Sequence, residues 1–419
     1  MSGRRRRLFC SLAPLLLHTA ASAPNKIPTW LKTRAHQLGY KSLTPIQSQA
    51  IPTLLDNKDA ILIAPTGSGK TLAYLLPLIS LLKPQSSIQA LVLAPSRELA
   101  KQVAGVARQL VKASPERILV MALLDGSGAR RQRIWMKAEP PQLVIGNVEQ
   151  VDTIFRENLL QFNSLRTLVV DEVDACFSDS SVRPAVQRLL TEHSTGEPGS
   201  TRSIITRQTI FVSASLPQRQ HFQRQSVQQR WSSTLPVLIS PQPDEKVPDQ
   251  LIHQYAVCES SKRVAALRVL LRNTVASEDN MGLSIVFVRH GRPIERIAQA
   301  LEGIVEDGAP VILHEDLSLA HRAATICAVR AGSRKILVAT PMAARGLDFE
   351  QCSHIFLFDI PATAEDYLHA AGRCGRFGRR GRVNVLCSKK ETFVLNRVGN
   401  ALGITFEQVH LELMSQAKG

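Results

Sequence analysis

Residues 64–71 carry the residue types that phosphate chemistry needs. They read APTGSGKT and stand between an apolar run and an apolar helical stretch. Gly67 and Gly69 let the backbone wrap a phosphate chain, and amides at a helix start point toward it. Lys70 supplies a positive charge for the β- and γ-phosphates, and the Thr71 hydroxyl is a ligand for Mg²⁺. The segment predicts a phosphate-binding loop; the alternative is a glycine-rich turn in an ordinary βα unit.

Three carboxylates follow a later apolar run. Asp171-Glu172-Val173-Asp174 comes directly after Thr167–Val170. Carboxylates at the carboxyl end of a buried parallel strand lie at the top of the sheet, beside the loop. We expect Asp171 to hold Mg²⁺ through water, and Glu172 to orient and polarise an attacking water. An acidic turn alone is weak evidence, but together with the loop it predicts a Walker-type nucleotide site.

The elements that position these residues are visible as short runs rich in Val, Ile and Leu, separated by helix-period stretches. Uniformly apolar runs are typical of parallel strands covered by helices on both faces. Their alternation with helices predicts an α/β doubly wound fold. The expected strands are Ala60–Ala64, Ala90–Ala94, Arg117–Leu123, Leu143–Ile145, Thr167–Val170, Gln208–Val212, Leu283–Val288, Val311–Leu313, Lys335–Ala339, His354–Phe358 and Val383–Cys387. Expected helices include Leu72–Leu82, Glu98–Lys112 and Pro293–Glu302.

A length of 419 residues suits two domains rather than one. Prolines at positions 236, 241, 243 and 248 separate the two sets of apolar runs. Proline at this density cannot continue a helix or a central strand. We expect a transit peptide at 1–25, an ATP-binding domain at 26–235, a linker at 236–249 and a second α/β domain at 250–419.

Lys and Arg outnumber Asp and Glu by 51 to 35, which gives a formal charge of +16. Such an excess predicts a polyanionic partner, with nucleic acid as the first candidate. A cationic targeting segment with solvated basic faces is the alternative. The seven scattered cysteines form no CxxC pair, so neither a zinc site nor a disulfide framework is expected. No apolar run reaches the roughly 18 residues of a membrane span, so no membrane partner is expected.

The N-terminal segment is basic and free of acids as far as Asp56. It contains Arg4 to Arg7 and several hydroxyl-bearing residues, a composition typical of an organellar transit peptide. Two alternatives remain: a weak secretory hydrophobic region at Leu12–Leu17, and a plain basic arm or nuclear signal.

From about Ile27 to Phe393 the order of motifs resembles the DEAD-box family of ATP-dependent RNA helicases, with DEVD in place of DEAD. The resemblance implies two tandem RecA-like domains, each a mostly parallel sheet with helices on both faces. It implies ATP and Mg²⁺ as cofactors, and a monomer that binds RNA through its backbone with weak sequence preference. The implied activity is RNA-dependent ATP hydrolysis coupled to RNA clamping and local unwinding, in organellar RNA metabolism or ribosome assembly. Two alternatives are an RNA-binding clamp with little unwinding and a DNA-directed or non-nucleic P-loop ATPase.

The resemblance also implies which residues meet the nucleotide. The Gln47 amide would read the adenine edge, and Trp30 would pack near the base unless it is a core aromatic. Arg373 and Arg376, in the run HAAGRCGR, would bring guanidinium groups to the γ-phosphate. The nucleotide-binding residues would be Trp30, Thr44, Gln47, Ala64, Pro65, Thr66, Gly67, Ser68, Gly69, Lys70, Thr71, Gly346 and Asp348. The catalytic residues would be Lys70, Asp171, Glu172, Arg373 and Arg376, and the metal ligands Thr71 and Asp171.

Further motifs are assigned by resemblance to RNA and to coupling between the domains. Gly126 stands where the family has a double-glycine turn, and Ser213-Ala214-Ser215 resembles motif III. The RNA-binding residues would be Ser96, Arg97, Gly126, Arg322 and Thr340. The residues coupling ATP to domain closure would be Ser213, Ser215, Asp174 and His369. Arg379, Arg380 and Arg382 would attract nucleic acid without touching ATP.

Four positions depart from the family pattern. Gly146–Glu149 replaces Thr-Pro-Gly-Arg, Glu315 replaces Gly, Pro341 replaces Asp, and Ala370 replaces Arg. These departures cluster on RNA contacts and on coupling between the domains, whereas the nucleotide residues are all present.

Three segments resemble the plant plastid subgroup of this family. They are Met121–Gly126, Lys137–Pro141 and the DEVD box. Together with the Arg-rich N-terminus, they favour the chloroplast over the mitochondrion.

Overall fold

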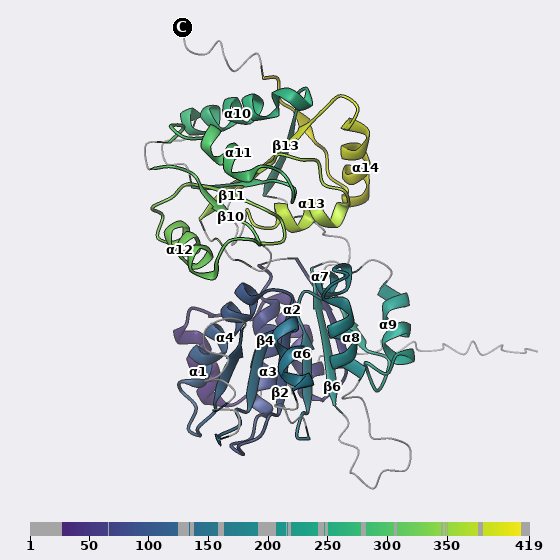
Figure 1. Ribbon diagram of the computed structural model, residues 1–419. Coiled ribbons are helices and arrows are strands. Elements are labelled where there is room, and N and C mark those ends of the chain that lie inside the picture. The colour runs from purple at the N-terminus through teal and green to yellow at the C-terminus, as the bar shows by residue number, and fades with distance from the viewer. Residues whose placement is uncertain are drawn as a thin grey trace, which may run out of the picture.

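The computed structural model describes residues 27–65, 67–124, 134, 138–157, 163–191, 207–214, 216, 219–241, 247, 250–277, 282–305, 308–344, 347, 349, 351–375 and 380–411. Within these ranges the chain forms two sheets of seven strands each. The two sheets belong to separate lobes, one above the other in Figure 1. The expected α/β architecture is therefore confirmed.

All strand pairings in the first sheet are parallel. The strand order is β3-β4-β2-β5-β6-β1-β7. The strands are β1 (Ala60–Ile63), β2 (Ala90–Ala94), β3 (Val120–Leu123), β4 (Leu143–Asn147), β5 (Thr167–Val170), β6 (Gln208–Ser213) and β7 (Val237–Ile239). Successive residues of a strand point to opposite faces, so Leu62 enters one hydrophobic cluster and Ile61 the other. This explains why the central strands are apolar throughout.

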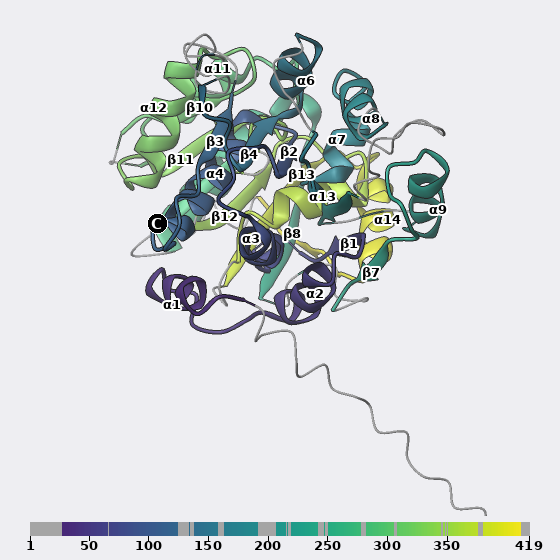
Figure 2. The same cartoon turned by 90° about the horizontal axis from the view of Figure 1, so that it is seen from below.

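The helices of the first lobe cover both faces of its sheet. They are α1 (Thr29–Gln37), α2 (Pro45–Leu55), α3 (Lys70–Leu81), α4 (Arg97–Val111), α6 (Val148–Arg156), α7 (Val173–Ser178), α8 (Arg183–Thr191) and α9 (Arg219–Gln228). Helices α1 to α4 contribute to one hydrophobic cluster, and α6 to α9 contribute to the other. Figure 2 shows α1, α2 and α3 on one side of the strands and α6 and α8 on the opposite side.

The second sheet repeats this pattern with strand order β10-β11-β9-β12-β13-β8-β14, again all parallel. The strands are β8 (Leu251–Val257), β9 (Leu283–Phe287), β10 (Val311–Leu313), β11 (Ile336–Ala339), β12 (Cys352–Leu357), β13 (Gly381–Cys387) and β14 (Glu407–Gln408). The helices are η2 (Ser260–Lys262), α10 (Arg263–Ser277), α11 (Ile294–Ala300), α12 (Leu319–Arg330), α13 (Ala364–Ala371) and α14 (Thr392–Leu402).

Three described strands, β7, β8 and the two-residue β14, are absent from the sequence-based expectation. Strand β7 lies inside the expected linker and pairs with β1. It is an edge strand and Pro236 precedes it, so proline removes no ladder hydrogen bond. Strand β8 was not expected, because His253 and Gln254 interrupt its apolar run.

The strand order brings the predicted site residues together. Strands β5, β6 and β1 are neighbours, so the segments that follow their carboxyl ends meet at one edge of the sheet. In the second lobe, α13 lies at the side that faces the first lobe, opposite α7 (Figure 1). Among the described helices, none is long and apolar enough to cross a lipid bilayer.

Candidate nucleotide site and domain interface

The loop between β1 and α3 has the backbone of a phosphate-binding turn. Gly67 and Gly69 adopt left-handed conformations, with φ of 81° and 91°. A Cβ on Gly69 would lie 2.3 Å from the Gln47 Nε2 atom, so a side chain there would displace the Gln47 amide, and the φ of this position itself favours glycine. The Lys70 ammonium donates to the carbonyls of Ala64, at 2.6 Å, and Pro65, at 2.9 Å. The lysine therefore lies inside the loop that it was predicted to serve.

Gln47 joins α2 to this loop. Its Nε2 donates to the Gly69 carbonyl at 3.1 Å, and its Oε1 accepts from the Thr44 amide at 2.9 Å. A side-chain amide has two N–H donors and two lone pairs, so these bonds leave one of each for a base edge. Trp30 is partly buried and packs against the core of the first lobe. This is the position expected of a core aromatic, which was the alternative to a role beside the base.

Asp171 is a buried carboxylate at the end of β5. Its Oδ2 accepts from the Tyr74 hydroxyl at 2.8 Å, and its Oδ1 accepts from the Glu172 amide at 2.9 Å. Burial, with a further contribution from the Glu172 charge, raises the pKa of Asp171 from 3.8 to about 6. The same burial raises the pKa of Tyr74 well above its usual value, so the phenol keeps its proton and donates it. A buried carboxylate of this kind favours a divalent cation nearby.

Glu172 has a strained backbone and an unsatisfied oxygen. Its φ is 45°, in the left-handed region that a non-glycine residue rarely adopts. Its Oε2 atom is buried and has no hydrogen-bond partner within the described part of the chain. Buried polar atoms without partners are uncommon, and they mark places where a ligand or water completes the set. The side chain thus fits the water-orienting role predicted for it.

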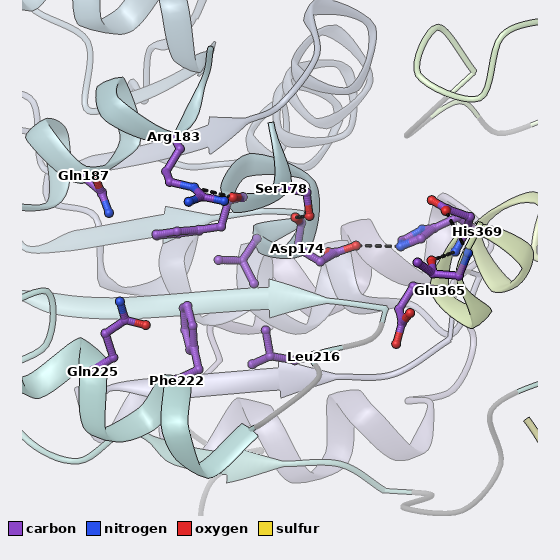
Figure 3. Close-up of a pocket in the computed structure, with 13 residues that line it drawn as sticks. Asp174, Ser178, Arg183, Gln187, Leu216, Phe222, Gln225, Glu365 and His369 are labelled. Atoms are coloured by element: carbon purple, nitrogen blue, oxygen red, sulfur yellow. Dashed lines mark hydrogen bonds and ion pairs between the residues drawn. The ribbon is translucent and has the colours of Figure 1, made fainter. Parts of the chain in front are cut away.

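A chain of polar contacts crosses from the first lobe to the second through Asp174. Its Oδ1 accepts from the Ser213 hydroxyl at 2.7 Å, and its Oδ2 lies 2.6 Å from Nε2 of His369 on α13. Figure 3 shows the side chains of Asp174 and His369 pointing toward each other from the two lobes. Three of the four residues predicted to couple the domains are therefore in one continuous contact.

Arg373 is the second link between the lobes. Its guanidinium donates to the carbonyls of Leu347, at 2.8 Å, and His369, at 3.3 Å. Its Nη2 lies 3.9 Å from Oε1 of Glu172. The arginine expected to reach the γ-phosphate thus lies against the carboxylate expected to orient the water.

Arg322 and Glu98 form a third bridge between the lobes, at 2.8 Å. Both side chains are largely buried, with 14% and 10% of their surface exposed. Arg322 was predicted as an RNA contact, and in this arrangement its charge is directed at the first lobe instead.

Several predicted site residues lie outside the described ranges. They are Thr66, Gly126, Ser215, Gly346, Asp348 and Arg376. The expected transit peptide at 1–25 also lies outside them.

Two contact residues could not have been found from the sequence. Tyr74 reads as one more core position of an apolar helix, and Glu98 as an exposed acid in the first turn of α4. Only the fold brings Tyr74 to Asp171 and Glu98 to Arg322.

Comparison with known proteins decides the family. Residues 44–222 match the DEAD/DEAH box helicase family, and residues 262–378 match the helicase conserved C-terminal domain. The rice (Oryza sativa subsp. japonica) DEAD-box ATP-dependent RNA helicase 58, chloroplastic, is 38% identical, covering 98% of this chain and 92% of the relative. Its Arabidopsis thaliana namesake is 37% identical, covering 92% of this chain and 83% of the relative. The chain belongs to the DEAD-box family of ATP-dependent RNA helicases. The predicted likeness to the plant plastid subgroup is confirmed by the same two relatives.

Solved DEAD-box structures share the two-lobed fold. S. cerevisiae Dbp5 bound to RNA and ADP BeF3 is 25% identical, with a TM-score of 0.79, covering 93% of this chain and 96% of that chain. Mss116 bound to ssRNA and UDP-BeF is 20% identical, with a TM-score of 0.81, covering 92% of this chain and 78% of that chain. The expected tandem RecA-like architecture is confirmed. A mitochondrial relative, Arabidopsis helicase 47, is 29% identical, covering 91% of this chain and 75% of the relative.

A cavity of about 600 Å³ adjoins the contact between Asp174 and His369 in this DEAD-box protein. Its apolar wall comes from the first lobe and includes Phe177, Leu216 and Phe222, whereas Glu365 lines it from α13. Figure 3 shows both walls. Because its walls come from both lobes, the cavity exists only while the lobes are apposed.

Packing explains the glycine at position 146, the first residue of the departure at residues 146–149. A Cβ on Gly146 would lie 2.5 Å from a methyl of Val151 and 2.8 Å from the Leu123 carbonyl, so glycine is needed where β3, β4 and α6 meet. Asn147 donates to the Glu149 carboxylate at 3.2 Å. Glu149 stands at the position where the family pattern that this sequence resembles has arginine.

Proposed function

We propose that the protein is an RNA-dependent ATPase that uses ATP binding to close its two lobes over one RNA strand. Closure bends the bound strand and separates short duplexes locally, and hydrolysis reopens the lobes. The observation that carries this proposal is the meeting of Glu172 with Arg373, and of Asp174 with His369, across the interface. These contacts connect the predicted hydrolytic site directly to lobe geometry.

The nucleotide-binding residues fit ATP with Mg²⁺. Gln47 and the loop containing Lys70 would hold the base and the phosphates, and Thr71 with Asp171 would hold the metal. When bound, Mg²⁺ neutralises charge on the β- and γ-phosphates. Glu172 orients water, and Arg373 stabilises charge that develops on the transferred phosphoryl group. Support comes from the raised pKa of Asp171 and the unsatisfied oxygen of Glu172.

The proposed partner is RNA, held through phosphates and 2′-hydroxyls with weak sequence preference. S. cerevisiae Dbp5, whose fold matches that of this chain, is bound to RNA in its solved structure. Ser96 and Arg97 begin α4 at the carboxyl end of β2, where the Ser96 hydroxyl accepts from the Leu99 amide at 3.2 Å. A formal charge of +16 supports a polyanionic partner. We place the protein in the chloroplast, on the strength of its two chloroplastic relatives.

The test is the ATPase rate of the full chain with and without single-stranded RNA, followed by a strand-separation assay on a short duplex. We expect RNA to raise the rate by at least about tenfold, and duplex to be lost only when ATP is present. Lys70→Ala is the control and should lose productive ATP binding. ATP-dependent RNA binding without stimulated turnover would instead indicate a clamp. Equal stimulation by DNA of the same sequence would contradict the RNA assignment.

A further inference from the structure

Three of the four departures from the family pattern line one cavity. Glu315, Pro341 and Ala370 all border a space of about 400 Å³ at the carboxyl edge of the second sheet. The loops after β9, β10, β11 and β12 and one side of α13 form its walls. Changes that are far apart in the sequence therefore alter a single site, which also contains Thr340, a predicted RNA contact.

Glu315 takes the hydrogen that Thr340 would offer to a phosphate. The Thr340 hydroxyl donates to Oε1 of Glu315 at 2.8 Å. A hydroxyl has one hydrogen, so this bond leaves it none for a second acceptor. The remaining carboxylate oxygen of Glu315 lies 3.6 Å from Nδ1 of His290, which is largely exposed.

The other two departures act differently: Ala370 lacks the positive charge of the arginine in the family pattern, whereas Pro341 removes both a backbone donor and the carboxylate of an aspartate. Two other charged residues of the cavity, Arg289 and Asp359, form hydrogen bonds within the second lobe. Arg289 donates to the Ile360 carbonyl at 3.3 Å, and Asp359 accepts from buried Arg263 at 3.2 Å. A third acid of the cavity, Asp366, accepts from the Thr363 amide at 3.2 Å. Of these three acids, Glu315 is the one hydrogen-bonded to Thr340 in the described part of the chain.

We propose that Glu315 is a negative determinant of RNA binding by the second lobe. The proposal rests on the proposed function, since it concerns how the same RNA strand is held. The Glu315 carboxylate accepts the hydrogen of the Thr340 hydroxyl and repels the phosphate that would bind there. Two unit charges about 4 Å apart interact by about 1 kcal/mol even in a water-like medium, which corresponds to about a fivefold change in affinity.

The first experiment measures the affinity of the full chain for a fluorescent single-stranded RNA, with a non-hydrolysable ATP analogue present. Glu315→Gly is expected to tighten binding by about fivefold or more, with a steeper salt dependence. Glu315→Gln preserves the side-chain volume and should tighten binding by a smaller factor. The matched control is Asp316→Asn, the same charge change one residue away, on a side chain that is 78% exposed. Its affinity should stay within about twofold of the wild type, because exposed charges are screened.

The second experiment is a double-mutant cycle with Thr340→Val. In the wild-type background the loss of the hydroxyl should change RNA affinity by less than about twofold, because Glu315 already holds it. In the Glu315→Gly background the same change should weaken binding by about fivefold, because a hydrogen bond to a phosphate has then been lost.

The outcomes separate this proposal from the proposed function. Equal effects of Thr340→Val in both backgrounds, or equal effects of Glu315→Gly and Asp316→Asn, overturn the role of Glu315 alone. A wild-type chain that binds no RNA overturns the proposed function and this proposal with it. Each variant is checked for unchanged affinity toward the ATP analogue, which shows that it is folded.

Discussion

Asp171 and Glu172 are adjacent in the chain, yet the fold gives their carboxylates different environments. Asp171 accepts hydrogen bonds from Tyr74 and from a backbone amide. Glu172 has a left-handed backbone and lies 3.9 Å from Arg373, and its Oε2 has no hydrogen-bond partner in the described part of the chain. Neighbouring carboxylates with different surroundings can divide the work, one holding a metal and the other orienting water.

Glu172→Gln should retain ATP binding and lose hydrolysis, because the amide preserves shape but does not polarise water. RNA should then remain trapped in the closed state when ATP is present. We expect turnover to fall by at least about a hundredfold, measured as phosphate release at saturating RNA. Normal release of phosphate by this variant would contradict the role given to Glu172.

Tyr74→Phe tests whether the buried phenol holds the Asp171 carboxylate in position for a metal. We expect the affinity for a fluorescent ATP analogue to fall by about tenfold with Mg²⁺ present, since a hydrogen bond to a charged group is lost. With EDTA the affinity should be unchanged, because the loop around Lys70 is intact. An equal loss under both conditions would mean that Tyr74 serves only the core.

At the residue scale, the sequence was most informative where chemistry is local. The loop from Ala64 to Thr71 is a continuous segment, so its glycines and lysine could be assigned without a structure. Tyr74 could not be assigned, because its partner lies 97 residues away and its helix is apolar on every side.

At the scale of elements, uniform apolarity predicted eleven of the fourteen described strands, and the three that it missed lie at one end of each sheet. Strand β8 was missed because polar residues interrupt it, and β7 because prolines surround it.

Asp59 shows a second limit of prediction from the sequence. Its buried carboxylate accepts from the amides of Thr209, at 2.6 Å, and Ser233, at 2.8 Å. It thereby connects the starts of β1 and β6 to the segment that leads into β7. Hydrogen bonds from backbone amides to a buried side chain that is distant in the sequence cannot be recognised from a sequence pattern.

His253 of β8 makes the second lobe sensitive to acid. Burial lowers its pKa from 6.5 to about 4, while its Nδ1 pairs with the Tyr367 hydroxyl at 2.5 Å. The unfolded chain gains a proton near pH 6.5 and the folded chain only near 4, so stability is lost as the pH falls between these values. After allowance for the part of the ring that meets solvent, we expect about 1–2 kcal/mol.

His253→Gln removes this titration and keeps an acceptor for Tyr367. Amide hydrogen exchange in β8 and α13 should show wild-type protection falling more than variant protection between about pH 7.5 and about pH 5. Parallel losses in the two proteins would show that His253 does not contribute to the acid sensitivity.

For the whole molecule, the sequence could predict two lobes but not the way in which they meet. Three described contacts define the apposition: Asp174 with His369, Glu172 with Arg373, and Glu98 with Arg322. Each joins side chains from opposite lobes, so no periodicity within one lobe reveals it. The motif resemblance gave roles to the residues of the first two pairs, and the structure showed all three contacts.

Reversing the charges of the Glu98 and Arg322 pair tests the apposition. Glu98→Arg or Arg322→Glu alone places like charges at a largely buried contact, and RNA-stimulated ATP hydrolysis should fall by at least about tenfold. The double reversal should recover to within about threefold of the wild type. If Arg322→Glu abolishes RNA binding and the double variant stays inactive, then Arg322 contacts RNA instead.

The proposed function requires the second lobe to complete the hydrolytic site by bringing Arg373 to the first. The most direct measurement compares analogue binding and single-turnover hydrolysis in Arg373→Ala at saturating RNA, with Arg380→Ala as a control from the adjacent basic run. We predict analogue affinity within about threefold of the wild type and hydrolysis slowed by about a thousandfold or more, whereas Arg380→Ala hydrolyses normally. Hydrolysis by Arg373→Ala at the wild-type rate would contradict the account.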